Sequence, residues 1–211
     1  MRRNRKVKIL ATVGPASSEE PMLRKLFEAG ADVFRINMSH SSHDLMRELV
    51  KRIRNVEVAV KRPIGILCDL QGPKLRVGKF ENVKVELTQG QTFTLDDNPA
   101  PGNNLRVHLP HPEILQSVQP GHRLLIDDGK LSARVVVWER DIVTAEVMRA
   151  SAKGQKLKPE KGLNLPGAEL DIQALTAEDL SHLDFVAANA DIIGYSFVQT
   201  PEDVRRLADE L

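Results

Sequence analysis

The sequence predicts an α/β fold in which a parallel sheet is interrupted by a small antiparallel β domain. Apolar, β-branched segments alternate with amphipathic helical segments up to residue 70 and again from residue 176. Between them, short runs of alternating apolar and polar residues are separated by Gly, Pro and Asn turns. The first pattern is typical of βαβ units and the second of a small antiparallel barrel. We therefore predict one domain formed by residues 1–76 and 163–211, with a second domain, residues 77–162, inserted into it.

The first segment should contain three strands separated by two helices. The strands are expected at residues 7–13, 33–38 and 64–70. Ser17 or Ser18 is a suitable N-cap for the first helix, and Gly30 is a suitable end for it. The second helix is expected over residues 43–60, where apolar side chains recur at helical spacing.

The remaining elements are expected inside the insertion and after it. Four alternating runs of the insertion are predicted to be strands of the small barrel: residues 83–87, 92–95, 123–127 and 131–135. After the insertion, Thr176 and Asp179 form the pattern of a capped helix N-terminus. A strand is expected over residues 191–198, and Thr200 followed by Pro201 should begin a last helix.

The composition is that of an ordinary water-soluble protein. The 211 residues are 41% hydrophobic and 28% charged with a net charge of +1, so there is no electrostatic case for nucleic-acid or membrane binding. The single cysteine, Cys68, excludes an internal disulfide, and its apolar surroundings indicate a core residue. No segment approaches the roughly 20 apolar residues of a transmembrane helix. We predict a cytoplasmic protein.

Two predicted strands end in clusters of polar and charged residues. These are residues 34–40 (FRINMSH) and residues 68–76 (CDLQGPKLR). Arg35 and Arg76 offer forked donors for phosphate, while Asn37, Ser39 and Asp69 offer hard oxygen ligands for a cation. The C-terminal ends of parallel strands are where α/β proteins place their sites, so the pattern predicts a site for a metal–phosphate substrate. A structural ion-pair network at the strand ends is the alternative.

These two segments resemble the paired signature of the pyruvate kinase family, and further segments resemble that family in the same order. They are residues 8–17 (KILATVGPAS), 126–129 (IDDG), 161–167 (KGLNLPG), 175–179 (LTAED) and 195–198 (YSFV). The resemblance extends from Lys8 to about Val204. It implies a partial TIM (β/α)8 barrel of about four βα units, with the inserted β-barrel domain as a lid.

The resemblance also implies an activity: phosphoryl transfer from phosphoenolpyruvate to ADP, giving pyruvate and ATP. A complete barrel has eight strands and about 250 residues, whereas four strands are predicted here outside the insertion, so the chain resembles the N-terminal half of the enzyme. In the family, the catalytic lysine and the acids that bind divalent metal follow the segment that ends at Leu211. We therefore expect the 211-residue chain to be inactive alone. A non-catalytic half-barrel that binds nucleotide or docks on a full-length partner is the alternative.

Roles for individual residues follow from the resemblance. Arg35 would hold the phosphate of phosphoenolpyruvate. The nucleotide side would be formed by Asn37, Ser39, His40, Arg76 and Lys161. The family's monovalent-cation site matches Asn37, Ser39, Asp69 and Leu70. A divalent cofactor, Mg²⁺ or Mn²⁺, and a homotetramer of the full-length form are implied in the same way.

The chain departs from the commoner family pattern at Leu70, Gln71 and Lys74. Many members have Thr, Lys and Glu at these positions and require potassium. The ammonium of Lys74 can supply the positive charge that bound K⁺ otherwise gives, and Leu70 removes a hydroxyl from that site. The sequence therefore resembles the potassium-independent subgroup, and we expect that K⁺ is not required.

Overall fold

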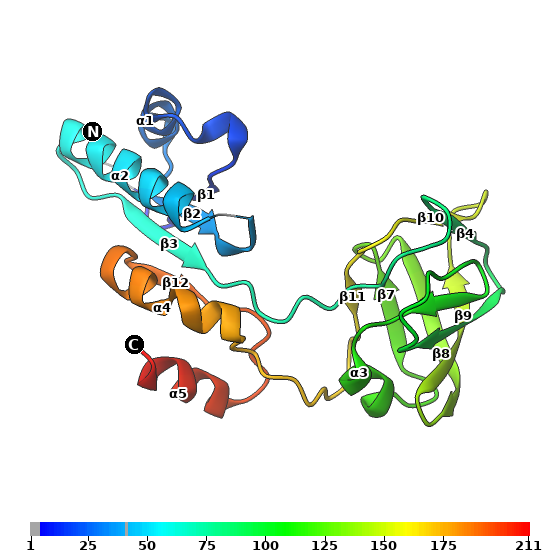
Figure 1. Ribbon diagram of the computed structural model, residues 1–211. Helices are drawn as coiled ribbons and strands as arrows, with labels where there is room; N and C mark the ends of the chain where they lie inside the picture. The colour runs from blue at the N-terminus through cyan, green and yellow to red at the C-terminus, as the bar shows by residue number, and fades with distance from the viewer. Residues whose placement is uncertain (1–4, 41) are drawn as a thin grey trace. The chain divides into compact units, whose positions relative to one another are not determined.

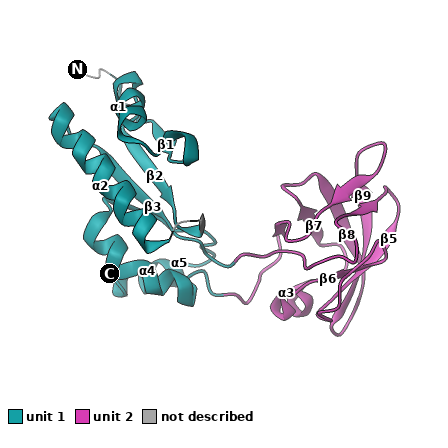
Figure 2. Ribbon diagram, turned by 45° about the horizontal axis from the view of Figure 1, so that its top comes forward, with its two compact units in different colours: residues 1–73, 173–211 teal, residues 74–172 magenta. Residues whose placement is uncertain are grey.

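The computed structural model describes residues 5–40 and 42–211, apart from the side chain of His40. The chain, which Figure 1 shows with its helices and strands labelled, forms two compact units, and Figure 2 shows these units in different colours. Unit 1 lies within residues 1–73 and 173–211, and unit 2 comprises residues 74–172. Unit 2 is therefore a domain inserted between the two segments of the chain that form unit 1.

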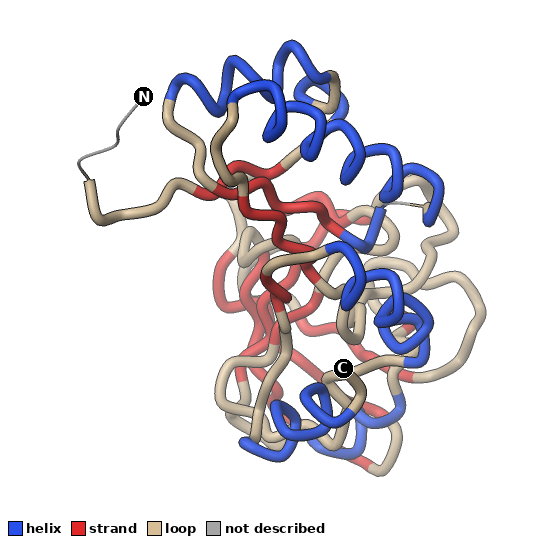
Figure 3. Tube along the Cα trace, turned by 90° about the vertical axis from the view of Figure 1, so that its left-hand side faces the viewer, coloured by secondary structure: helices blue, strands red, loops and turns tan. Residues whose placement is uncertain are grey.

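Unit 1 contains a four-stranded parallel sheet. In spatial order its strands are β1 (Leu10–Thr12), β2 (Val33–Asn37), β3 (Gly65–Asp69) and β12 (Ile192–Gly194). The helices that follow them are α1 (Glu20–Ala29), α2 (His43–Val60), α4 (Ala177–Asn189) and α5 (Pro201–Asp209). Short 3-10 helices, η1 (Pro15–Ser17) and η2 (Met38–His40), follow β1 and β2. Strands and helices alternate along this unit (Figure 3), which confirms the predicted α/β class and the four βα units.

Two of the predicted helix starts are confirmed in detail. Thr176 and Thr200 are the N-caps of α4 and α5, and each forms a reciprocal capping box with the aspartate three residues later, Asp179 or Asp203. Gly30 ends α1 as expected, with a φ of 132° that favours glycine.

The predicted cap of the first helix is wrong. Helix α1 follows Glu19, which makes no side-chain cap hydrogen bond, and Pro21 lies in its first turn. Ser17 instead belongs to η1, where its hydroxyl accepts the N–H of Gly14 at 2.9 Å. A serine hydroxyl serves a tight turn as readily as a helix, so its presence alone could not separate the two.

The core of unit 1 lies between the sheet and its helices. Phe34, Ile36, Ile66 and Cys68 are at most 1% exposed and belong to one apolar cluster with buried helix residues such as Ile53. Side chains alternate along a strand, so the intervening residues of β2 and β3 fall on the opposite face of the sheet. This alternation places the predicted polar residues on the face that the helices do not cover.

Unit 2 contains a six-stranded and a two-stranded sheet around one hydrophobic core. The larger sheet has the order β11 (Leu163–Asn164), β7 (Arg123–Ile126), β8 (Leu131–Glu139), β9 (Ile142–Arg149), β5 (Thr92–Asp96) and β6 (Arg106–His108). The smaller sheet pairs β10 (Gln155–Leu157) with β4 (Val85–Leu87), and α3 (Pro112–Ser117) is a short helix. All four predicted strands are present. The expectation of a wholly antiparallel domain is wrong at one pair, because β5 and β6 are parallel.

The inserted unit is larger than predicted, since it begins at residue 74 and ends at residue 172. Strand β11 pairs with β7 of unit 2, and Leu163 and Leu165 are buried in the core of that unit. Leu170 and Ile172 also pack against it. The segment after Gly162 therefore belongs to the insertion. No helix in the described part of the chain is long and apolar enough to cross a membrane.

Candidate functional site

Arg35 of β2 contacts two polar side chains, Thr12 and Asp69, at the C-terminal ends of β1 and β3. Arg35 Nε donates to Asp69 Oδ2 at 2.9 Å, Nη2 donates to the same oxygen, and Nη1 donates to Thr12 Oγ1 at 3.2 Å. The side chains of Arg35 and Asp69 are 27% and 18% exposed. Two predicted site residues therefore meet, and the ion pair that the sequence left open as an alternative is present.

Part of the Arg35 guanidinium remains available to bind an anion. An arginine side chain has five N–H donors, and the contacts with Asp69 and Thr12 use three of them. Because the pair is partly exposed, a phosphate oxygen can reach the remaining donors while Asp69 stays in place. The carboxylate then acts as the group that orients the guanidinium.

Gly194 leaves the space that the Asp69 carboxylate occupies. It lies opposite Asp69 in the parallel pairing of β12 with β3, and a Cβ at this position would lie 2.5 Å from Asp69 Oδ1. A side chain at position 194 would therefore displace the carboxylate from Arg35. The sequence analysis singled out neither Gly194 nor Thr12. For Thr12 the available signal was its position near the end of the strand predicted over residues 7–13, whereas Gly194 lies inside the strand predicted over residues 191–198 and had no such signal.

One predicted nucleotide-side residue, Asn37, lies next to this ion pair in unit 1. Asn37 is opposite Asp69 in the register of β2 and β3, and its Oδ1 accepts the N–H of Ser39 at 3.0 Å. This hydrogen bond fixes the turn from β2 into η2. The side chain of His40 lies outside the described residues.

A pocket of about 550 Å³ opens beside Asn37. Its other walls come from the loop after β1 and from α2, and they include Val13, Pro15, Leu45 and Leu49. A mostly apolar lining with a side-chain amide at one end suits a flat, largely apolar group. The sequence analysis did not identify this pocket, because its walls come from segments that are far apart in the chain.

The sequence argument about the Leu70 side chain is wrong. That side chain is 2% exposed and belongs to the helix-facing core, whereas Asp69 lies on the opposite face of the strand. A hydroxyl at position 70 would be surrounded by apolar side chains and would not reach the Asp69 carboxylate. Strand alternation, which is readable from the sequence, could have shown this.

Cys68 is a core residue, as predicted. Its side chain is fully buried in the cluster between the sheet and the helices. Burial, with a smaller contribution from the negative charge of Asp191, raises the pKa of the Cys68 thiol to about 11. The thiol is therefore protonated at neutral pH and is not a nucleophile.

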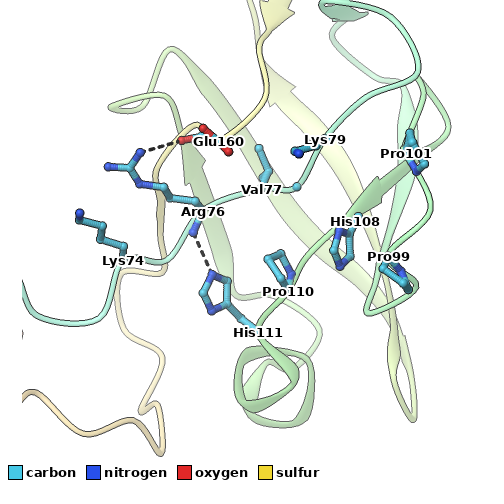
Figure 4. A pocket seen from close by; sticks show the side chains of 11 residues that line it. Lys74, Arg76, Val77, Lys79, Pro99, Pro101, His108, Pro110, His111 and Glu160 are labelled. Atoms are coloured by element: carbon cyan, nitrogen blue, oxygen red, sulfur yellow. Dashed lines mark hydrogen bonds between the residues drawn. The ribbon is translucent and has the colours of Figure 1, made fainter. Parts of the chain in front are cut away.

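Arg76 belongs to unit 2, where it lines a pocket of about 630 Å³ (Figure 4). Its guanidinium approaches the carbonyl oxygen of Glu160 at 3.5 Å. Lys74 and Lys79 line the same pocket, and Glu160 is the carboxylate in the lining. Three cationic side chains around one pocket create a positive potential that favours an anionic ligand.

His111 holds the main chain at Arg76. The Arg76 N–H donates to His111 Nε2 at 3.0 Å, so that nitrogen must be unprotonated. The ring proton then sits on Nδ1, which lies 3.3 Å from Glu113 Oε1. The sequence analysis assigned no role to this histidine. The contact joins residues 35 positions apart, so no local spacing could reveal it.

Lys161 forms an ion pair with Asp127 in unit 2. Its Nζ lies 2.9 Å from Asp127 Oδ1, and Lys130 Nζ lies 3.1 Å from Oδ2. The hydrogen bond from Lys161, followed by the one from Lys130, lowers the pKa of the Asp127 carboxyl. Asp127 is therefore ionised at neutral pH and positions Lys161. It lies in the IDDG segment, which the sequence analysis named without assigning a site residue.

These observations first define a class of protein: a parallel βα sheet with a cluster of polar and charged side chains at its strand ends and a β domain inserted after the third strand. The comparison with known families is consistent with this class. The family model described as "Pyruvate kinase, barrel domain" matches residues 4–211. The chain belongs to this family.

Individual relatives agree. A pyruvate kinase of Methylorubrum extorquens is 50% identical over 209 residues, which cover 97% of this chain and 42% of the relative. One from Agrobacterium vitis is 42% identical over 206 residues, covering 97% and 43%. The crystal structure of a pyruvate kinase from Cryptosporidium parvum superimposes with a TM-score of 0.90 at 30% identity, covering 98% of this chain and 42% of that one. The chain thus spans less than half the length of these relatives.

Proposed function

We propose that the chain carries part of the active site of a pyruvate kinase, which transfers the phosphoryl group of phosphoenolpyruvate to ADP and yields pyruvate and ATP. This proposal rests mainly on the position and the hydrogen bonds of Arg35. This residue is held at the C-terminal end of β2 by Asp69 and Thr12 and keeps two N–H donors for a phosphate. Membership of the family and the names of the relatives support the same reaction.

The roles divide between the two units. Arg35 binds the phosphate of phosphoenolpyruvate, and the apolar pocket beside Asn37 receives the nucleobase. The family resemblance assigns nucleotide binding to Asn37, Ser39 and His40 of unit 1, and it assigns contacts with nucleotide phosphates to Arg76 and Lys161 of unit 2. Phosphoryl transfer is catalysed mostly by positioning and charge neutralisation. An oriented guanidinium and an oriented ammonium serve that purpose.

The cations implied by the family fit these residues to different degrees. The described residues include no group of three Asp, Glu, His or Cys side chains that could hold a metal ion. This part of the chain therefore forms no complete site for Mg²⁺ or Mn²⁺, and we assign that ion to none of its residues. Asn37, Ser39 and Asp69 offer hard oxygen donors that suit a monovalent cation, and Leu70 can contribute only a main-chain oxygen.

A chimera tests the proposed function. Residues 1–211 would replace the matching part of the Methylorubrum extorquens relative, and pyruvate formation from phosphoenolpyruvate and ADP would be followed by coupled reduction to lactate. We expect the chimera to be active. We expect Arg35→Gln to lower kcat/KM roughly 100-fold or more, because removing one oriented donor that stabilises charge in the transition state typically has an effect of this size. Arg24→Gln is the matched control, because Arg24 pairs with Glu28 on the surface of α1. It should leave the rate within about twofold.

The outcome separates the two functions that the sequence left open. If the chimera folds but is inactive, and the 211-residue chain still binds ADP, the result would favour the non-catalytic half-barrel. An active chimera in which Arg35→Gln is as active as Arg24→Gln would remove Arg35 from the site. The homotetramer and the cytoplasmic location implied by the resemblance remain predictions.

We further propose that the enzyme does not need potassium, because the ammonium of Lys74, five residues after Asp69 in the sequence, supplies the positive charge. The chimera would be assayed with K⁺ or with a bulky organic cation at equal ionic strength. The unchanged chimera should keep its rate without K⁺, whereas Lys74→Glu should lose most of it and regain it when K⁺ is added. Lys79→Glu changes a lysine of the same pocket and should stay independent of K⁺. If the unchanged chimera loses its activity without K⁺, this proposal is wrong.

A further inference from the structure

Positive charge also gathers in a second place on unit 2. Arg123 of β7, Arg134 of β8 and Arg149 of β9 surround a pocket of about 260 Å³, whose lining Ser132 and Met148 complete. We call it the triple-arginine pocket. It shares no lining residue with the pocket of Arg76, so it is independent of the proposed nucleotide site.

The strand register places two of these arginines directly opposite each other. Arg123 pairs with Arg134 in the antiparallel ladder of β7 and β8, while their neighbours Leu124 and Ala133 face the core. Opposite residues have Cβ atoms about 5 Å apart, and like charges in this arrangement are destabilising. Within the described residues neither guanidinium forms an ion pair, although Glu146 lies opposite Arg134 on β9. The positive charge of this pair is therefore not neutralised by a direct ion pair within the described residues.

A β-bulge brings the third arginine to the same pocket. Ser132 pairs with Arg149 and Ala133 pairs with Val147, so β9 has an extra residue at this point. Arg149 Nη2 donates to the carbonyl oxygen of Gly129 at 2.9 Å, which fixes the direction of its side chain. Ser132 is 7% exposed and lines the pocket, where its hydroxyl is a further short donor.

We propose that the triple-arginine pocket binds a compact phosphate compound, such as pyrophosphate or a small phosphate ester. Guanidinium forks match phosphate oxygens, and a bound dianion turns the repulsion between Arg123 and Arg134 into attraction toward a shared ligand. The volume lies below the usual range of small-molecule pockets, so it suits one or two phosphate groups and not a nucleotide. Met148 offers an apolar wall for the small organic part of an ester.

The test uses the 211-residue chain, labelled with ¹⁵N, and pyrophosphate as the probe. Amide signals would be followed by NMR during a titration at constant ionic strength, with sodium chloride as the reference salt. We expect saturable shifts at Ser132, Arg134 and Arg149. The double variant Arg123→Gln/Arg134→Gln should bind at least tenfold more weakly. Lys153→Gln/Lys156→Gln removes the same charge from exposed positions of unit 2 outside the pocket and should bind within twofold of the unchanged chain.

Each outcome bears on the proposal. Shifts equal to those from sodium chloride, or an equal loss of affinity in both double variants, would overturn it, since either result indicates general charge screening. If the arginine double variant does not fold, Arg149→Gln replaces it with the same expected loss. Signals at Arg35 and Arg76 are read separately. Their response reports on the proposed active site alone, so failure of one proposal does not imply failure of the other.

Discussion

The two units differ in how completely each covers its own apolar surface. In unit 2, inward side chains from different strands, such as Phe93, Leu124 and Val143, are at most 2% exposed. In unit 1, Leu10 and Ile192 on the edge strands are 48% and 44% exposed. Their register with β2 and β3 places them on the same face of the sheet as Arg35. The face of unit 1 that carries the candidate phosphate site is thus partly uncovered, while the inward faces of the unit 2 strands are buried in one core.

The largest effect expected from this difference is in independent folding. Unit 1 has a sheet with two edges and an open face, so it should unfold before unit 2 and be prone to aggregation, whereas residues 74–172 should fold alone. Limited proteolysis of the 211-residue chain should cut unit 1 first and leave a protected fragment close to residues 74–172. The isolated fragment should unfold cooperatively, followed by the fluorescence of Trp138. Early destruction of unit 2, with unit 1 spared, would contradict this.

The sequence predicted the parts of each unit that depend on local rules. Thr176 with Asp179 is a local capping pattern, and the polar residues Arg35, Asn37 and Asp69 directly end or interrupt apolar strands, so both features were readable. The contact of His111 with the main chain of Arg76 was not readable, because it depends on tertiary packing. The parallel pairing of β5 with β6 was missed for the same reason.

The length of a strand was a second feature that the sequence did not predict correctly. A strand was expected over residues 191–198, but β12 covers only Ile192–Gly194. Phe197 has a φ of 62°, which no strand residue adopts, and its ring lies close to Gly72. Tertiary packing of the loop therefore overrides the β propensity of a Tyr-Ser-Phe-Val run. The triple-arginine pocket likewise depends on register and on a bulge, neither of which the sequence analysis considered.

A smaller effect is expected from the hydrogen bonds that hold the last residues of unit 1 before unit 2 begins at residue 74. Asp179 is fully buried, and besides capping α4 its carboxylate accepts the N–H groups of Gln71 at 2.8 Å and Gly72 at 3.1 Å. Asp203 caps α5 in the same way but at a partly exposed position. Asp179→Ala leaves buried N–H groups without an acceptor and should cost about 3 kcal/mol. Asp203→Ala should cost about 1 kcal/mol.

The two variants form a matched pair, since both remove the aspartate of a Thr-x-x-Asp box in unit 1. Urea unfolding followed by ellipticity at 222 nm measures both, because the helices other than α3 lie in unit 1. Equal losses of stability would show that the bonds to Gln71 and Gly72 contribute nothing beyond helix capping.

The smallest expected effect concerns a histidine pair that joins two helices of unit 1. His182 of α4 is 7% exposed, and its Nδ1 lies 2.7 Å from Nε2 of His43 at the start of α2. Burial, and then the charge of His43, lowers the pKa of His182, while Glu178 and Asp179 partly oppose this. One ring donates and the other accepts, so a second proton would remove the acceptor.

The lowered pKa sets the direction of the pH dependence. The unfolded chain takes up a proton at His182 near pH 6.5, before the folded chain does. Stability is therefore full above this pH and falls as the pH decreases toward the folded pKa. The Tm of the 222 nm transition should be lower at pH 5.5 than at pH 7.5, and His182→Gln should reduce that difference. His122→Gln should keep it, because that imidazole belongs to unit 2 and accepts the local N–H of Gln119. If His182→Gln keeps the full pH dependence of the unchanged chain, the titration lies elsewhere and the pair is only a packing contact.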